Sequence, residues 1–261
     1  MRIKGIKIDE DVARILNEQD KDFPEGSFAA WYGKDLSGQT YEDNLNCSNQ
    51  NLTSLFGCPS IVTGYFDCSD NKLTSLEGAP KEVEGHFYCN NNNKLTSLEG
   101  SPKEVGKSFY CHHNQLTSLE GAPEKVGWNF SCHHNQLTSL EGSPKEVGGS
   151  FECAHNELTS LEGASEKVGW VFSCHHNQLT SLEGSPKEVE GSFYCSCNKL
   201  TSLEGAPKVV GGHFDCSDNK LTSLEGSPKK VGGFFDCSNN PNLESLEGIG
   251  KVKGEIYSNI D

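Results

Sequence analysis

Seven of the nine histidines in the 261-residue chain lie in one stretch, where their imidazoles could bind a metal ion, exchange protons or anchor a partner protein. They follow regularly spaced cysteines and are His112, His113, His133, His134, His155, His175 and His176. Glu152 lies in the same stretch, and a carboxylate beside imidazoles could complete a zinc site or support acid–base chemistry.

Two interpretations of the histidines need no partner protein. Residues 122–135 and 164–177 are nearly identical, so duplication of a 42-residue unit could have multiplied the histidines without selection for them. Alternatively, imidazoles on neighbouring strands could share a zinc ion. Because no Cys-x-x-Cys or His-Glu-x-x-His spacing supports a zinc site, we assign no metal ligand.

A third interpretation is a partner-binding patch. Trp128 and Trp170 stand where most equivalent positions carry glycine, and aromatic side chains are frequent anchors of protein interfaces. The predicted partner-binding residues are Tyr110, His112, His113, Trp128, His133, His134, Glu152, His155, Trp170, His175 and His176. Since an unperturbed imidazole titrates near pH 6.5, we expect such contacts to change between about pH 5 and 7.

An internal repeat must position these side chains. Ten of the 12 cysteines recur every 21 residues, with one step of 22, at Cys47, Cys68, Cys89, Cys111, Cys132, Cys153, Cys174, Cys195, Cys216 and Cys237. Each unit has a short alternating stretch such as Phe-Ser-Cys, which predicts a half-buried strand, followed by an asparagine, two leucines and Glu-Gly. A unit this short cannot bury its apolar side chains alone, so the units must stack with their strands in a parallel sheet.

The run Phe-x-Cys-x-x-Asn-x-Leu-x-x-Leu resembles the core of the leucine-rich repeat. Val126 and Phe130 match its first two leucines, Cys132 the third, Asn135 the asparagine and Leu137 the last leucine. The short period resembles that of bacterial and phage-encoded repeat proteins. The resemblance implies a right-handed horseshoe-shaped solenoid, with a parallel β-sheet on the concave face, mostly extended or coil structure on the convex side, and protein binding as its role.

We expect three segments: an N-terminal cap over residues 1–44, about ten solenoid turns over 45–247 and a C-terminal capping strand over 248–261. In the small α/β cap, Ile3, Ile6 and Ile8 predict a strand, whereas Val12, Ile15 and Leu16 predict a short amphipathic helix. An apolar lid is expected from Phe23, Phe28, Ala29, Ala30, Trp31 and Tyr32. The opposite end of the solenoid is lightly protected, which would allow a homodimer through that end.

The ten repeated cysteines share one inward register, so we expect buried core thiols rather than disulfides or metal ligands. Largely reduced thiols indicate a cytoplasmic location. Cys58 and Cys197 depart from the pattern, and Cys197 is expected to be exposed.

The composition and the missing motifs exclude several classes of protein. A net charge of −15 argues against nucleic-acid binding, and no apolar run is long enough for a membrane span. No catalytic motif is present, and we expect neither catalytic residues nor a cofactor. We therefore predict a non-enzymatic, protein-binding leucine-rich-repeat protein, with a metal- or pH-responsive binder using the histidines as the alternative.

Overall fold

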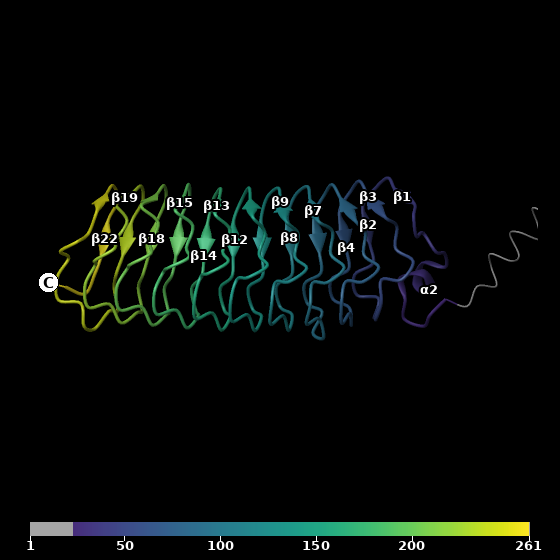
Figure 1. The fold of residues 1–261 in the computed structure, drawn as a ribbon, viewed down its shortest axis with the longest axis horizontal. Coiled ribbons are helices and arrows are strands. Elements are labelled where there is room, and N and C mark those ends of the chain that lie inside the picture. Colours follow the sequence, from purple (N-terminus) through teal and green to yellow (C-terminus); the bar gives the residue numbers. More distant parts are fainter. Residues whose placement is uncertain (1–22, 261) are drawn as a thin grey trace, which may run out of the picture.

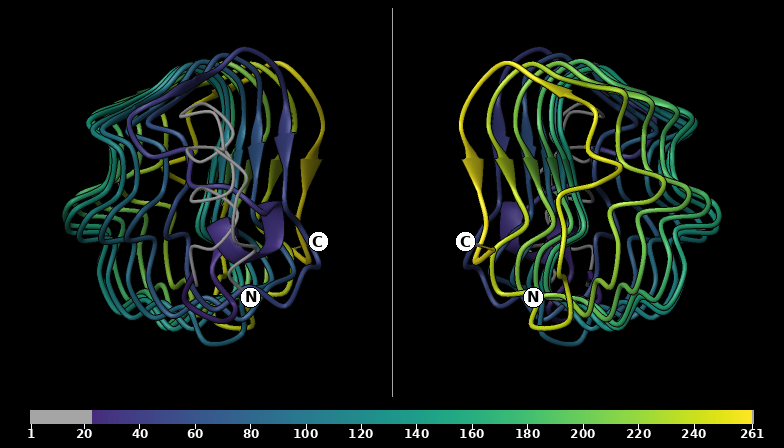
Figure 2. Two further views of the ribbon diagram at one scale, coloured as in Figure 1. Left: turned by 90° about the vertical axis from the view of Figure 1, so that its right-hand side faces the viewer. Right: turned by 90° about the vertical axis from the view of Figure 1, so that its left-hand side faces the viewer.

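The computed structural model describes residues 23–260 and shows an elongated solenoid of stacked turns (Figure 1). Two parallel sheets of 11 strands each run along its length, and strands of the two sheets alternate along the chain. Seen along the axis, the turns nearly superimpose and fan out gradually from one end to the other (Figure 2). This architecture confirms the predicted repeat solenoid with a parallel sheet.

The predicted sheet, here called the phenylalanine sheet, takes one two-residue strand from each turn. Its strands are β2 (Leu45–Asn46), β4 (Phe66–Asp67), β6 (Phe87–Tyr88), β8 (Phe109–Tyr110), β10 (Phe130–Ser131), β12 (Phe151–Glu152), β14 (Phe172–Ser173), β16 (Phe193–Tyr194), β18 (Phe214–Asp215), β20 (Phe235–Asp236) and β22 (Ile256–Tyr257). Phe130 pairs with Phe109 on one side and Phe151 on the other, so the rings form an inward column. The residue after each phenylalanine points to the outer face, as alternation predicts.

A second sheet, here called the valine sheet, lies on the side that was predicted to be mostly extended or coil. Its strands are β1 (Thr40–Tyr41), β3 (Ile61–Val62), β5 (Glu82–Val83), β7 (Glu104–Val105), β9 (Lys125–Val126), β11 (Glu146–Val147), β13 (Lys167–Val168), β15 (Glu188–Val189), β17 (Val209–Val210), β19 (Lys230–Val231) and β21 (Lys251–Val252). Each strand carries a single inward apolar residue just before a corner, so the sequence shows no alternation there. A corner of three residues, often containing glycine, separates it from the next phenylalanine strand.

The core is one continuous apolar cluster built from five columns. In a representative turn, Val126, Phe130, Cys132, Leu137 and Leu140 are each at most 1% exposed. All ten repeated cysteines are buried free thiols, as predicted. Burial raises their pKa values above the ordinary range, so they remain protonated small apolar groups.

The two irregular cysteines differ from each other. Cys58 is also buried and free, and burial raises the pKa of its thiol. Cys197, which was predicted to be exposed, is half-buried on the outer face, where burial and then the nearby Asp218 raise its pKa. Neither thiol therefore has the lowered pKa of a reactive nucleophile.

A ladder of buried asparagines joins successive turns. The Nδ2 atom of Asn135 donates hydrogen bonds to the carbonyl oxygens of Cys111, one turn back, and Cys132, at 3.1 and 3.0 Å. Its Oδ1 atom accepts a hydrogen bond from the backbone N–H of Leu116 at 3.0 Å. Each asparagine thus satisfies backbone groups that neither sheet can pair.

The single 22-residue step is absorbed outside both sheets. Phe87 still pairs with Phe109, so the register of the phenylalanine sheet is unchanged. The extra residue follows Asn92, where the Leu95 N–H bonds to the Asn92 carbonyl at 2.8 Å in a tight turn. The Asn114 side chain then accepts a hydrogen bond from the Asn92 N–H at 2.7 Å.

The N-terminal end of the described chain carries the short helix α2 (Phe28–Tyr32), capped by Ser27 and by Gly33 at φ 78°. Phe28 is fully buried and joins the main core, whereas Trp31 and Tyr32 remain exposed. The strand predicted around Ile3, Ile6 and Ile8 and the helix predicted around Val12, Ile15 and Leu16 lie outside the described residues. Between residues 23 and 260, no helix is long and apolar enough to cross a membrane.

Candidate functional site

Two columns of imidazoles lie side by side on the outer face of the phenylalanine sheet. The outer histidine column occupies the second position after each cysteine, where the backbone is left-handed with φ between 52° and 53°: His113, His134, His155 and His176. Other turns place Asp70, Asn91, Asp218 or Asn239 there in the same conformation. These side chains tolerate positive φ better than β-branched ones, which explains why such residues recur at this position.

The outer histidine column is a stack of nearly parallel rings. Centroid separations are 4.4 Å between His113 and His134, 4.3 Å between His134 and His155, and 4.3 Å between His155 and His176. The interplanar angles lie between 8° and 12°. One imidazole per turn therefore forms an ordered, exposed strip along the solenoid.

The inner histidine column occupies the first position after each cysteine and is interrupted. His112 and His133 stack at 4.5 Å with 7° between their planes. The next turn carries the buried Ala154, and the turn after it carries His175. The column thus has stacked rings at His112 and His133, no ring at Ala154 and a ring again at His175.

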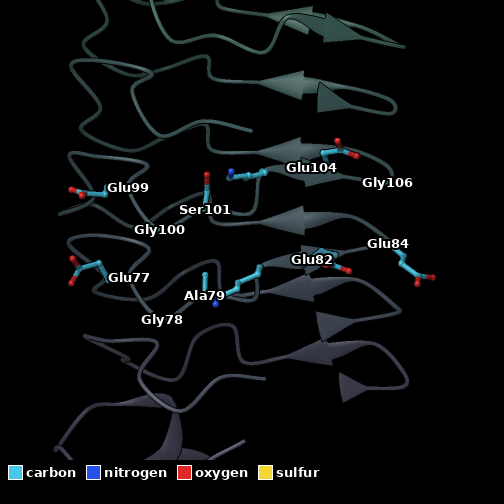
Figure 3. A pocket seen from close by; sticks show the side chains of 13 residues that line it. Glu77, Gly78, Ala79, Glu82, Glu84, Glu99, Gly100, Ser101, Glu104 and Gly106 are labelled. Carbon is cyan, nitrogen blue, oxygen red and sulfur yellow. The ribbon is translucent and has the colours of Figure 1, made fainter. Parts of the chain in front are cut away.

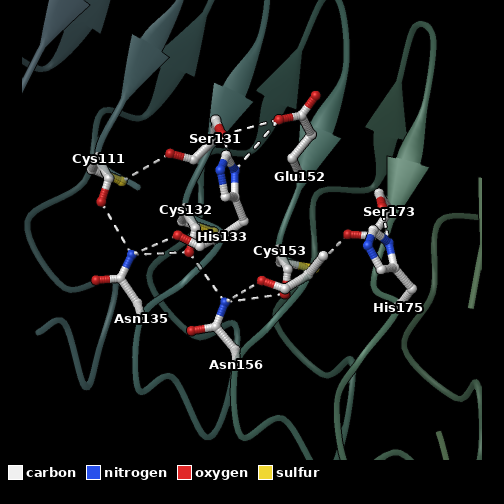
Figure 4. A network of polar contacts seen from close by, with 11 residues as sticks. Cys111, Ser131, Cys132, His133, Asn135, Glu152, Cys153, Asn156, Ser173 and His175 are labelled. Atoms are coloured by element: carbon white, nitrogen blue, oxygen red, sulfur yellow. Dashed lines mark hydrogen bonds and ion pairs between the residues drawn. The ribbon is translucent and has the colours of Figure 1, made fainter. Parts of the chain in front are cut away.

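Serines on the strands hold the inner imidazoles in place (Figure 4). The Ser131 Oγ atom lies 2.7 Å from Nδ1 of His133 and donates to Oε2 of Glu152 at 3.0 Å. Nδ1 of His133 is 3.6 Å from the same carboxylate oxygen. Ser173 makes the equivalent 2.7 Å contact with Nδ1 of His175.

The electrostatics of the face favour neutral imidazoles beside an ionised carboxylate. Burial, followed by repulsion from neighbouring imidazolium groups, lowers the pKa of both His112 and His155 to about 4. The same causes lower the pKa of His134 and His175. Contact with His133 and Ser131 holds the pKa of Glu152 below its usual value. For His112 and His155, charging therefore falls below the pH range of 5 to 7 expected from an unperturbed imidazole, and for His134 and His175 it is displaced in the same direction.

One cluster on the described part of the chain brings three ligand atoms together. His112, His113 and His133 each offer a ring nitrogen, and these atoms lie within 4.8 Å of one another. Nδ1 of His112 is buried and has no hydrogen-bond partner. However, a metal ion lies close to the plane of each imidazole that binds it, and the parallel rings of His112 and His133 cannot meet that condition together. Binding an ion here requires at least one ring to rotate.

An aromatic group that was not predicted as part of the site extends the histidine columns towards the N-terminus. Tyr88 stacks on Tyr110 at 5.0 Å and contacts Tyr65 edge-on at 6.1 Å, and His86 lies 5.7 Å from both Tyr88 and Trp128. Tyr65 and His86 each stand just before the phenylalanine of their turn. The position just before the cysteine follows two residues later. Alternation places both positions on the same face, and this signal could have identified them.

We call the resulting area the ring surface. It consists of Tyr65, His86, Tyr88, Tyr110, His112, His113, Trp128, His133, His134, His155, His175 and His176. Successive members touch through ring contacts, and Glu152 is linked to them through His133. The structure therefore brings together ten of the eleven residues named from the sequence.

Trp170 is the predicted residue that stays apart. Its side chain is 70% exposed and makes no ring contact with any residue from 23 to 260. It lines a separate hollow at the valine sheet with Lys125, Glu146 and Lys167. Trp128, by contrast, packs against His86 and lies under Lys107, whose Nζ is 5.6 Å from the ring centroid.

A larger hollow of about 1040 Å³ lies away from the ring surface, between the Glu-Gly turns and the valine sheet (Figure 3). Its lining includes Glu77, Glu82, Glu84, Glu99 and Glu104. It contains none of the residues predicted from the sequence to bind a partner.

No family model matches the chain, and no curated protein matches it. Among solved structures, the chain is similar to YopM from Yersinia enterocolitica WA-314, with 16% sequence identity and a TM-score of 0.42 over 94% of this chain and 73% of that one. The geometry of the chain itself, with a parallel sheet, an inward apolar column and an asparagine ladder in successive turns, confirms the predicted repeat solenoid.

Proposed function

We propose that the protein is a non-enzymatic scaffold that binds another protein through the ring surface, on the face expected to be concave. The observation that carries this proposal is the unbroken series of contacts between exposed and half-buried rings from Tyr65 to His176 on a parallel sheet. Aromatic and imidazole side chains have few rotatable bonds, so a partner can bury them at a low entropic cost.

The charges of the face support a protein partner over nucleic acid. Asp67 lies on one flank of the ring surface and Asp215 and Asp236 on the other, on the same face of the sheet. The whole chain carries a net charge of −15, which repels phosphate backbones and favours a partner with basic groups. The twelve free thiols support a reducing, cytoplasmic setting for this interaction.

A pull-down with two matched variants tests the proposal. Tyr110→Ser/Trp128→Gly replaces two members of the ring surface with residues that other turns carry at the same positions. Trp170→Gly removes a still more exposed aromatic ring outside that surface. We expect specific partners to be lost from the double variant and recovered in full with Trp170→Gly. Equal recovery with all three proteins would remove the ring surface as the binding site.

The alternative is a metal- or pH-responsive binder that uses the histidines, and the 4.8 Å cluster of His112, His113 and His133 favours it. Calorimetric titration of the reduced protein with zinc is the corresponding test. A micromolar site that disappears in His112→Ser/His133→Ser would support the metal-responsive alternative, whereas the absence of saturable heat would eliminate a zinc site.

The exposed C-terminal edge supports a further proposal, a homodimer through the end of the solenoid. Strands β21 and β22 each pair with a described strand on one side only, and Ile256 and Tyr257 are 43% and 45% exposed. A concentration-dependent mass in light scattering, abolished by Ile256→Lys, would support this dimer.

A further inference from the structure

The interruption of the inner histidine column leaves a slot about one ring thick. The stack of His112 on His133 shows that adjacent turns place rings 4.5 Å apart in this column. Ala154 belongs to the turn between His133 and His175, because β12 pairs with β10 on one side and β14 on the other. A flat group inserted over the Ala154 methyl would therefore lie between two imidazole faces.

A hollow marks this slot on the surface. Its volume is about 430 Å³, and its lining includes His133, Ala154, His175, Glu152 and Tyr194. The walls are preformed, because Ser131 fixes the imidazole of His133 and Ser173 fixes that of His175. A ligand entering the slot does not have to order these rings first.

The slot has a negative group beside it with a free acceptor atom. Oε2 of Glu152 accepts a hydrogen bond from Ser131 and lies near His133, whereas Oε1 has no partner among residues 23–260. Contact with His133 and Ser131 lowers the pKa of Glu152, so the carboxylate is ionised at neutral pH. Burial lowers the pKa of His175, so that wall of the slot is an uncharged ring.

We propose that this slot binds the guanidinium group of an arginine side chain from the partner protein, a proposal that rests on the proposed function. Guanidinium is planar, stacks on π faces and presents several donors to a carboxylate in one plane. It is the side-chain group that can fill a ring-thick slot and pair with the Glu152 carboxylate at its edge.

Other side chains satisfy only part of the site. A lysine ammonium group would pair with Glu152 but is not flat and would leave the imidazole faces uncovered. A neutral aromatic ring would fill the slot but would bury a carboxylate oxygen without a partner, which costs binding free energy. The slot therefore discriminates by shape and charge at once.

Small-molecule probes test the slot on the full chain. The ¹³C-methyl signal of Ala154 and the imidazole signals of His133 and His175 are followed by NMR during titration with N-acetyl-arginine amide. We expect saturable shifts with a dissociation constant of roughly millimolar size, since one side chain offers few contact atoms. N-acetyl-lysine amide and N-acetyl-tyrosine amide should bind at least about ten times more weakly, because each lacks one of the two interactions.

Two variants complete the experiment. Ala154→His fills the slot with the residue that the neighbouring turns carry, so the fold should persist while the arginine shifts vanish from His133 and His175. Glu152→Gln keeps the shape and should weaken arginine binding about ten-fold or more, because it removes a charge-assisted pair. Arginine shifts that persist in Ala154→His, or equal affinity for the three probes, would overturn the arginine assignment.

The pull-down separates this inference from the broader function. If Tyr110→Ser/Trp128→Gly loses the partner while Ala154→His retains it at wild-type level, the ring surface stands and the arginine slot falls. If both variants lose the partner and Trp170→Gly keeps it, both proposals are supported.

Discussion

At the scale of single residues, one asparagine side chain per turn hydrogen-bonds the stretch of backbone that links the phenylalanine sheet to the first leucine. The backbone N–H and C=O groups of this stretch cannot pair with one another within a turn, because the chain bends too sharply after each cysteine. The asparagine side chain has both donors and an acceptor, so it can bond to carbonyl groups in two turns and to one backbone N–H. Alanine or leucine at this position would leave these groups buried and unpaired.

The asparagine ladder gives a direct prediction of stability. Asn135→Ala removes the bonds to the carbonyls of Cys111 and Cys132 and to the N–H of Leu116. We expect the free energy of unfolding to fall by about 2–4 kcal/mol, as the buried backbone groups lose their partners. Urea denaturation measures this loss, with the exposed substitution Gln136→Ala as a control that should change stability by less than about 0.5 kcal/mol. Equal midpoints for the two variants would contradict the role of the ladder.

At the scale of the structural element, each turn depends on a glycine after the second leucine. Gly142 has φ +83°, and a Cβ atom there would lie 2.8 Å from the carbonyl carbon of Leu119 in the preceding turn. The same two constraints recur in the equivalent glycine of other turns, for example Gly121 and Gly163. The Glu-Gly pair is therefore required both by the backbone conformation and by the close approach of stacked turns.

Gly142→Ala should therefore destabilise the solenoid although it adds only a methyl group. We expect a loss of about 2–3 kcal/mol, since positive φ and overpacking both oppose the new Cβ. The neighbouring Ser143→Ala is a suitable control, because Ala122 and Ala164 occupy that position in adjacent turns. Thermal unfolding that is unchanged by Gly142→Ala would show that the turns can move apart at this point.

The sequence was most informative where a residue repeats in every turn. The inward cysteines, the leucines and the asparagines could be predicted because 21-residue periodicity fixes which positions must face the core. The valine sheet could not, since a strand such as Glu146–Val147 has one inward residue followed by a glycine corner, whereas each phenylalanine is followed two residues later by an inward cysteine. The left-handed backbone at His113 and the stacking of its ring also depend on how tightly the turns approach, which the spacing alone does not specify.

The candidate site was predicted in part for a related reason. The histidines stood out because they are rare residues gathered in two columns. Tyr65 and His86 do not share this signal, because they precede the phenylalanine and lie outside the two columns after each cysteine. Trp128 and Trp170 replace glycine at equivalent positions, but Trp128 packs on His86 whereas Trp170 lines a hollow at the valine sheet.

At the scale of the whole molecule, the histidine columns couple stability to pH. The pKa values of His112 and His155 are about 4 in the folded protein and near 6.5 in an unfolded chain. Between these values the unfolded state binds more protons than the folded state. Stability should therefore be lost as the pH falls below about 6.5 and continue to fall towards pH 4.

This dependence can be assigned to the histidines with a matched variant. His112→Ser and His155→Asn together introduce residues that other turns carry at these positions. Between pH 7 and 5, where most carboxylates stay ionised, the urea midpoint of the wild-type protein should fall more than that of the double variant. Parallel midpoint curves for the two proteins would mean that these imidazoles are not destabilised by protonation in the folded state.

The central claim is that a partner protein contacts the ring surface rather than another part of the solenoid. Site-specific photo-crosslinking tests it most directly, with a benzoylphenylalanine placed at Tyr110 in one protein and at Trp170 in another. Both positions already carry an exposed or half-exposed aromatic ring, so neither change should disturb the core. We predict a specific crosslinked product from position 110 and none from position 170. A product from position 170 alone would contradict the account.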